Sequence, residues 1–145
     1  MASSLSVVDV PVHDVWARLA SDRSSILIDV RTRAEWAFVG LPDLAEIEKQ
    51  VLRIEWEAFP NGGIDPAFVA KLTAILDAAG VVKDTELFFI CRSGVRSRFA
   101  ALAMVAAGYA RSRNVAEGFE GPLDPHRHRG TVSGWKVAGL PWVQS

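Results

Sequence analysis

The only cysteine of the chain, Cys91, lies in a short stretch whose residue types suit chemistry on sulfur. That stretch reads Cys91-Arg92-Ser93-Gly94-Val95-Arg96-Ser97. An apolar run at 86–90 precedes it and predicts a buried strand, while helix formers at 98–107 predict a helix that ends at Gly108. Cys91 is therefore expected at the carboxyl end of a strand, in a turn that opens a helix, where ligands bind in open α/β sheets.

The surroundings of Cys91 favour a sulfur that carries negative charge. The first N–H groups of a helix have no partner within it, and the helix dipole adds partial positive charge there. A turn over Cys91 would aim several N–H groups at its sulfur, and Gly94 allows the backbone angle that such a turn needs. Arg92, Arg96 and Arg98 add positive charge. These residues predict a reactive thiolate rather than a small buried side chain, the ordinary alternative for a lone cysteine.

A second strand is expected to bring charged side chains to the same edge. Residues 25–30 show the pattern of a buried strand that ends in an acid, Asp29, and Arg31 follows. Because strands alternate with helices along the chain, we expect a parallel sheet whose carboxyl ends meet at one edge. Asp29 then either supports the cysteine turn or caps the helix that begins near Thr32. Glu35 either supports the site or is an exposed helix residue.

Other patterns predict the elements around this core. Runs at 5–10 and 50–56 predict two more strands, the second near a sheet edge, and 114–116 predicts a fifth. Asp65 and Pro66 indicate the start of a helix that carries an apolar stripe. Gly118 and Gly121 would let the backbone approach the cysteine turn, and Trp56 and Phe59 suit either the core or the rim of the site. The residues expected to fold back over the core are Trp135, Leu140, Trp142 and Val143.

Length and composition indicate an ordinary globular chain. Its 145 residues fit one domain, 1–145, with 50% hydrophobic and 23% charged residues. The net charge of −1 offers no basis for binding nucleic acid or an anionic membrane. A single cysteine rules out an internal disulfide and a cysteine-cluster metal site. The amino terminus lacks a secretory pattern and no apolar run could cross a bilayer, so we expect a cytoplasmic protein.

Four segments resemble the rhodanese family of sulfurtransferases. The cysteine loop at 91–96 is similar to the family's active-site loop, and 28–36 is similar to its Asp-Val-Arg segment with an acidic-aromatic pair. Residues 114–121 resemble its last strand and glycine-rich loop, and 134–142 resemble its carboxyl end. The segment 39–44 departs from the family because it lacks a histidine that many relatives carry. The resemblance implies a rhodanese-like α/β fold, a five-stranded parallel sheet flanked by helices on both faces.

The resemblance also implies a reaction and a set of site residues. Cys91 would take the outer sulfur of a thiosulfate-like donor and hold it as a persulfide, which a thiol, cyanide or an acceptor protein would collect. Arg92 and Arg96 would orient the donor's oxyanion, while Asp29 and Arg31 would brace the loop by hydrogen bonds and ion pairing. No metal or organic cofactor is implied. The residues expected to bind the donor and the persulfide are Arg92, Ser93, Gly94, Val95, Arg96 and Ser97.

Other interpretations stay open. A phosphatase or arsenate reductase on the same fold carries arginine as the sixth residue after its cysteine, whereas Ser97 stands there with arginines on both sides. A sulfur carrier or a non-catalytic interaction module is a further alternative; the intact cysteine and arginines argue against an inactive domain but are compatible with a carrier. His126 and His128 lie two apart in a charged stretch, where a solvated loop is favoured over an anion-binding rim. No third ligand stands beside them in a metal-binding motif.

Overall fold

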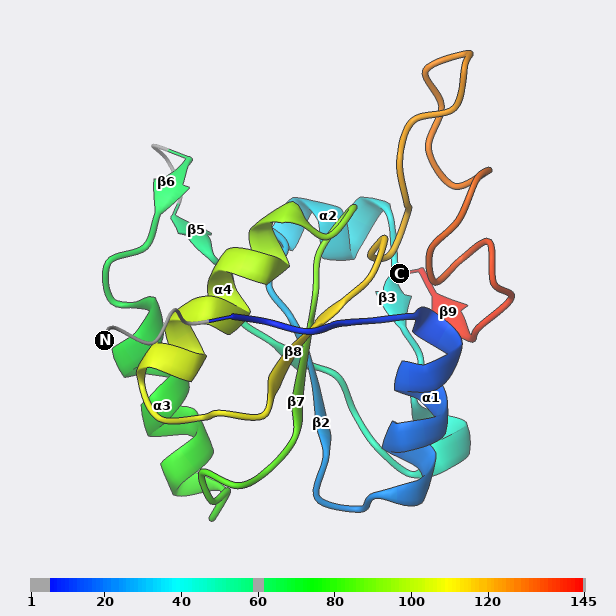
Figure 1. Ribbon diagram of the computed structural model, residues 1–145. Helices are drawn as coiled ribbons and strands as arrows, with labels where there is room; N and C mark the ends of the chain where they lie inside the picture. Colours follow the sequence, from blue (N-terminus) through cyan, green and yellow to red (C-terminus); the bar gives the residue numbers. More distant parts are fainter. Residues whose placement is uncertain (1–5, 59–61, 145) are drawn as a thin grey trace.

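A five-stranded parallel sheet forms the centre of the chain (Figure 1). The structure is a computed structural model that describes residues 6–58 and 62–144. The strands lie in the order β1-β8-β7-β2-β4, and each neighbouring pair is parallel, which confirms the expected sheet. Their bounds are Asp9–Val10 for β1, Ile26–Asp29 for β2, Leu52–Arg53 for β4, Leu87–Ile90 for β7 and Ser112–Val115 for β8.

The central strand β7 is apolar on both faces of the sheet, and each face packs against a separate hydrophobic core. Its four residues are fully buried. Leu87 and Phe89 pack in the core on one face of the sheet, and Phe88 and Ile90 pack in the core on the other. Ile90 pairs with Asp29 of β2, so the end of β2 lies beside the start of the cysteine loop.

Helices α3, Phe68–Ala78, and α4, Val95–Ala106, cover one face of the sheet (Figure 1). In α3, Phe68, Leu72 and Leu76 are buried at the four-residue spacing that keeps side chains on one side of a helix. Most of the residues that α4 buries are small, which lets this helix lie close to the sheet. They are Ser97, Ala100, Ala101 and Met104.

Helix α1, Val12–Ser21, covers the opposite face together with the carboxyl-terminal segment. Its buried residues are Val12, Val15 and Leu19. Trp135 is fully buried in the same core, and its ring meets that of Trp16 edge-on with centroids 6.0 Å apart. The sheet is therefore flanked by helices on both faces, as expected.

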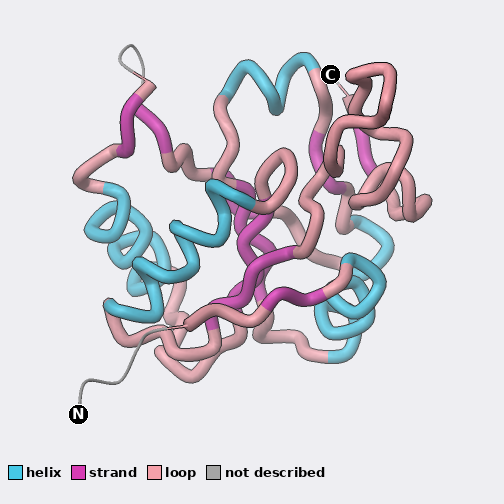
Figure 2. Tube along the Cα trace, turned by 45° about the horizontal axis from the view of Figure 1, so that its top comes forward, coloured by secondary structure: helices cyan, strands magenta, loops and turns pink. Residues whose placement is uncertain are grey.

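Short elements gather beyond the carboxyl ends of the strands. Figure 2 shows α2 between a hairpin of β5 and β6 on one side and the loop that follows β8 on the other. The bounds are Arg33–Phe38 for α2, Glu57–Ala58 for β5 and Gly63–Ile64 for β6. Strands β3, Leu41–Pro42, and β9, Trp142–Val143, form a second antiparallel pair, and a 3-10 helix, η1, spans Ala45–Ile47.

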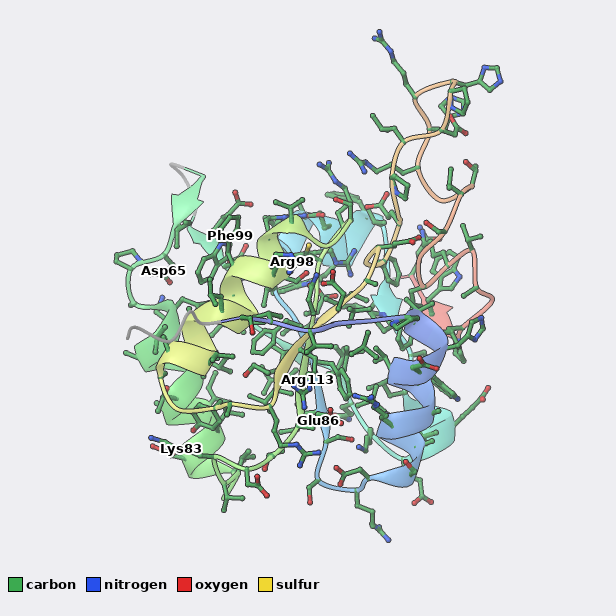
Figure 3. All side chains as sticks on the ribbon, viewed as in Figure 1. Asp65, Lys83, Glu86, Arg98, Phe99 and Arg113 are labelled. Carbon is green, nitrogen blue, oxygen red and sulfur yellow. The ribbon has the colours of Figure 1, made fainter. Side chains whose placement is uncertain are left out.

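The opposite end of the sheet is held by ion pairs around Glu86. Its Oε2 accepts a hydrogen bond from Arg18 Nη1 at 2.9 Å and one from Arg113 Nε at 3.1 Å. Figure 3 shows Glu86 and Arg113 together, well away from Arg98 on α4. These charges stabilise the amino ends of the strands and do not reach the cysteine loop.

Some element bounds differ from those expected. Of the strand expected over residues 5–10, residue 5 lies outside the described residues, and β1 spans only Asp9–Val10, which pair with β8. α3 begins at Phe68 rather than Pro66, since Asp65 forms a turn in which its Oδ1 accepts from Ala67 N and its carbonyl from Phe68 N. α4 begins at Val95, three residues before the expected start.

The large apolar residues of the carboxyl-terminal segment and of the β4–β5 region differ in burial. Trp135 and Leu140 are buried as expected, whereas Trp142 and Val143 form β9 and stay 38% and 48% exposed. Trp56 belongs to the core, with its ring 4.8 Å from that of Phe68, and Phe59 lies outside the described residues. Within the described ranges, each helix is too short or too polar to cross a membrane.

Candidate active site

The cysteine loop connects β7 to α4 in a tight turn. Cys91 follows the last residue of β7, and α4 starts only four residues later. Gly94 adopts a φ of 107°, a left-handed value that residues with a Cβ resist, and it serves as the N-cap of α4. The chain can thus turn back over Cys91 within three residues, as the glycine predicted.

The turn surrounds the sulfur with polar groups. The backbone N–H groups of Gly94 and Ser97 donate to Cys91 Sγ at N–S distances of 3.2 and 3.3 Å. The Ser97 hydroxyl oxygen lies 3.1 Å from the same sulfur. Cys91 is only 1% exposed, so these groups, rather than water, solvate its sulfur. Two N–H dipoles that point at one atom favour negative charge on it.

A pocket of about 450 Å³ opens beside this sulfur. It lies between the cysteine loop, the start of α2 and the β5–β6 hairpin. A larger hollow beside β3 and β9 has no nucleophilic side chain in its lining. The residues that line the pocket at the cysteine are Thr32, Glu35, Glu57, Cys91, Arg92, Ser93, Val95 and Arg96.

Arg96 is engaged by two carboxylates of that pocket. Its guanidinium donates to both oxygens of Glu35, at 2.7 and 2.9 Å, and lies 3.4 Å from Glu57 Oε1. Hydrogen bonding to Glu35 raises the pKa of Arg96. Burial by itself raises the pKa of Glu35, but the hydrogen bonds and charge of Arg96, together with hydrogen bonds from Thr32, outweigh it, and the pKa ends below its usual value.

This pairing bears on the role expected for Arg96. Two carboxylates already balance its charge, so the contact with a donor's oxyanion that the sequence suggested would compete with these ion pairs. It instead ties α4 to α2 and to the hairpin at the mouth of the pocket. Among the described residues, Arg92 has no ion-pair partner, and its side chain is exposed at the pocket. Arg92 therefore remains the candidate for contact with an anionic donor.

Asp29 and Arg31 form a fully buried ion pair at the end of β2. Arg31 Nη2 donates to Asp29 Oδ2 at 2.7 Å and to Gly40 O at 2.7 Å, and Arg31 Nε donates to Asp29 Oδ1 at 3.0 Å. Their side-chain hydrogen bonds link this segment to itself and to Gly40, not to the cysteine loop. Any support that they give to that loop therefore runs through other residues.

The indirect path runs through the glycine-rich loop after β8. Arg31 stacks on the Phe119 ring at 4.3 Å, and Phe119 N donates to Cys91 O at 2.8 Å. Glu120 N donates to Arg92 O at 2.9 Å. A Cβ on Gly118 would collide with Cys91 O and lie 2.7 Å from Arg92 C. The prediction that this glycine lets two backbones approach is confirmed.

The start of α2 explains how Glu35 reaches the site. Thr32, not Asp29, is the N-cap: its Oγ1 accepts from Glu35 N at 3.3 Å, and Glu35 Oε1 accepts from Thr32 N at 3.2 Å. This reciprocal capping box fixes the side chain of Glu35 on the first turn. The carboxylate is thereby held where Arg96 of α4 can bind it.

Sequence reasoning missed Asn114 and its partner Asp9, which belong to the hydrogen-bond network of Ser97. Asn114 of β8 is 2% exposed, and its Oδ1 lies 2.6 Å from Ser97 Oγ. Its Nδ2 donates to Gly94 O at 3.1 Å and to Asp9 Oδ1 at 2.9 Å. A signal was present, because a polar side chain in a buried parallel strand needs hydrogen-bond partners. The strand pattern did not reveal what those partners were.

The histidines lie far from this arrangement. His126 and His128 are exposed on the loop after β8, which projects away from the sheet (Figure 1). Their backbone N–H groups donate to Asp124 Oδ1 at 2.8 and 2.9 Å, so the carboxylate of Asp124 stabilises the turn. Throughout 6–58 and 62–144, no three His, Cys, Asp or Glu side chains are grouped to hold a metal ion.

Known proteins are similar to this chain along nearly its whole length. The crystal structure of Rv0390 from M. tuberculosis superimposes with a TM-score of 0.84 at 37% identity, covering 97% of this chain and 99% of that one. An uncharacterized protein from Rickettsia conorii is 32% identical over 138 residues, 95% of this chain and 98% of its own. A protein from Allochromatium vinosum named sulfurtransferase is 27% identical over 137 residues, 94% of this chain and 95% of its own.

The fold is rhodanese-like, as solved structures with the same architecture indicate and as the sequence predicted. Residues 9–145 match the family model described as STR4 middle domain. That span includes all the residues that build the pocket at Cys91. The chain belongs to the STR4 middle domain family.

Proposed function

We propose that this chain transfers a sulfane sulfur from thiosulfate or a similar donor to a thiophilic acceptor through a persulfide on Cys91. The observation that carries the proposal is the setting of Cys91, which lines a pocket and whose Sγ receives N–H groups from Gly94 and Ser97. Backbone donors cost no reorganisation when charge develops on sulfur. The sulfurtransferase of Allochromatium vinosum, similar over 94% of this chain, supports the same chemistry.

The reaction divides into two displacements at sulfur. In the first, the Cys91 thiolate attacks the outer sulfur of thiosulfate; the Sγ–S bond forms, the S–S bond of the donor breaks, and sulfite leaves with the electron pair. In the second, a thiolate or cyanide attacks the outer sulfur of the persulfide and Cys91 leaves as thiolate. Splitting the transfer in this way needs a nucleophile that is also a good leaving group, which a stabilised thiolate provides.

The charges of the pocket bear on the donor. Glu35 and Glu57 balance Arg96, so the attraction for an anionic donor rests on Arg92 and on the N–H groups of the loop. Bulk charge adds nothing, because the net charge is −1. This balance favours donors of modest charge and also permits an alkyl persulfide, whose sulfur would follow the same two steps.

Intact mass measurement tests the proposal. Protein treated with thiosulfate should gain the mass of one sulfur atom, which cyanide or dithiothreitol should remove. The Cys91→Ser variant should gain none, while Ser24→Ala, which changes an exposed turn before β2, should still gain it. Uptake by Cys91→Ser would refute the assignment. Stable persulfide without turnover to cyanide would instead identify a carrier that delivers sulfur to an acceptor protein.

Phosphatase or arsenate reductase chemistry is less well supported. Those enzymes need an arginine that returns across the loop to clamp several oxygens. The sixth residue after Cys91 is Ser97, whose side chain is fully buried against the sulfur, and the preceding Arg96 is held by Glu35. We expect no hydrolysis of aryl phosphates. Hydrolysis that depends on Cys91, without sulfur uptake, would overturn the proposal in favour of this alternative.

A further inference from the structure

A chain of hydrogen-bonding side chains lies behind the sulfur, on the side away from the pocket lining. It links Cys91 to Ser97 of α4, then to Asn114 of β8 and Asp9 of β1. The three heavy-atom distances are 3.1, 2.6 and 2.9 Å. Ser97 and Asn114 are both buried, so water does not compete for these contacts.

The orientation of the Asn114 amide is set by its neighbours. One end faces Gly94 O at 3.1 Å and Asp9 Oδ1 at 2.9 Å. A backbone carbonyl and a carboxylate can only accept hydrogen bonds, so this end must be the NH₂ group. The other end, which faces Ser97 Oγ at 2.6 Å, is therefore the carbonyl oxygen Oδ1.

That orientation decides where the Ser97 proton points. A hydroxyl has one proton, and Asn114 Oδ1 can only accept, so the short contact requires Ser97 to donate to Asn114. The Ser97 oxygen then turns a lone pair towards Cys91 Sγ, 3.1 Å away, which suits a thiol that donates its S–H. A thiolate at the same place would require the hydroxyl to rotate and give up its bond to Asn114.

We propose that Asn114 is a positioning residue that moderates the nucleophile Cys91 by competing with its sulfur for the Ser97 proton. The inference rests on the proposed function only in taking Cys91 as the nucleophile. Asn114 does not touch the pocket; it acts through Ser97. While Asn114 Oδ1 accepts the Ser97 proton, the Ser97 hydroxyl can donate to the sulfur only when the negative charge on the sulfur outweighs the attraction of Oδ1. Asn114 thus limits the reactivity of the free cysteine.

Other charged side chains lie near this sulfur. Arg92, Arg96, Glu35 and Glu57 line the same pocket as Cys91. Asp9 reaches the network from β1, where it is ion-paired with Arg98. A substitution at Asn114 leaves all of them in the chain, so a change in the behaviour of the sulfur reports on the network itself.

Two substitutions of Asn114 should have opposite effects on the pH profile of alkylation by iodoacetamide. Asn114→Val removes Oδ1, frees the Ser97 hydroxyl to donate to a thiolate, and should move the profile to lower pH. Because hydrogen bonds to charged groups exceed neutral ones by about 1 kcal/mol, the rate at about pH 6 should rise about three- to tenfold. Asn114→Asp keeps an acceptor for Ser97, and the negative charge that its carboxyl group gains on ionisation beside Asp9 should move the profile to higher pH.

Both variants lose the NH₂ group that binds Gly94 O, so a purely structural role would move both profiles the same way. In a Ser97→Ala background the effect of Asn114→Val should vanish, because no hydroxyl remains to be freed. If the valine variant does not fold, Asn114→Ala replaces it with the same expected sign. Shifts of one sign for both substitutions, or a shift that persists without the Ser97 hydroxyl, would overturn the proposal. Alkylation needs no sulfur donor, so failure of sulfur uptake leaves this test intact.

Discussion

Gly118 lets the loop after β8 approach the backbone of the cysteine loop closely. Replacing it therefore tests how far the cysteine loop depends on this contact. In Gly118→Ala, the new Cβ would collide with Cys91 O and lie 2.7 Å from both the carbonyl carbon and the oxygen of Arg92. These are backbone atoms, so no side chain can rotate away. The residue also has a φ of +64°, which strains any residue with a Cβ.

The magnitude follows from two contributions. Left-handed strain costs about 1–2 kcal/mol. Relief of the collision must lengthen the bonds from Phe119 N to Cys91 O and from Glu120 N to Arg92 O, now 2.8 and 2.9 Å, and each is worth about 0.5–1.5 kcal/mol. We expect Gly118→Ala to lower the free energy of unfolding by about 2–5 kcal/mol. The displaced carbonyls belong to the active loop, so sulfur uptake should slow as well.

Gly80→Ala is the matched control. Gly80 has a φ of +74°, and a Cβ there would meet nothing within 4 Å, so only the backbone strain remains. Urea unfolding of both variants should show a loss of about 1–2 kcal/mol for Gly80→Ala and a clearly larger one for Gly118→Ala. Sulfur uptake should be unchanged in Gly80→Ala. Equal losses of stability, or normal uptake by Gly118→Ala, would refute the claim that this contact shapes the loop.

Charged residues of the pocket give further expected outcomes. Arg92→Ala should lower kcat/KM for thiosulfate, by an amount that corresponds to about 1–3 kcal/mol of activation free energy. It should affect a neutral persulfide donor less, whereas equal losses would mean that Arg92 only shapes the loop. Arg96→Ala should slow both donors alike, because its guanidinium binds Glu35 and Glu57 rather than the donor. The pKa of Glu35 lies below its usual 4.5, so its contribution to stability should be present above that pH and lost as the pH falls through the lowered value. Acid unfolding of Glu35→Gln should lack this loss; an unchanged acid profile would contradict the ion pair.

The parts of the fold that could be predicted are those whose signal is local. The apolar runs of β2 and β7 are buried on both faces, so each reads as a strand without knowledge of its neighbours. The turn after Cys91 could be predicted for the same reason, since the left-handed backbone angle that it needs falls on one residue, Gly94. β1 and β4 are two-residue strands because each pairs only with the last two residues of its partner strand, a limit that no local pattern encodes.

Site residues divide along the same line. The capping box of Thr32 and Glu35 could be read from spacing, but the partner of Glu35 stands 61 residues away, and only the packing of α4 beside α2 brings Arg96 to it. Arg96 therefore looked like a free cation in the sequence although its charge is balanced in the structure. Asn114 is the sharper case: a buried amide must find partners for both of its ends, and strand order decides which. With β8 between β1 and β7, the amide group donates to Asp9 and its oxygen faces Ser97, so the hydrogen-bonding state of Cys91 depends on the order of three strands.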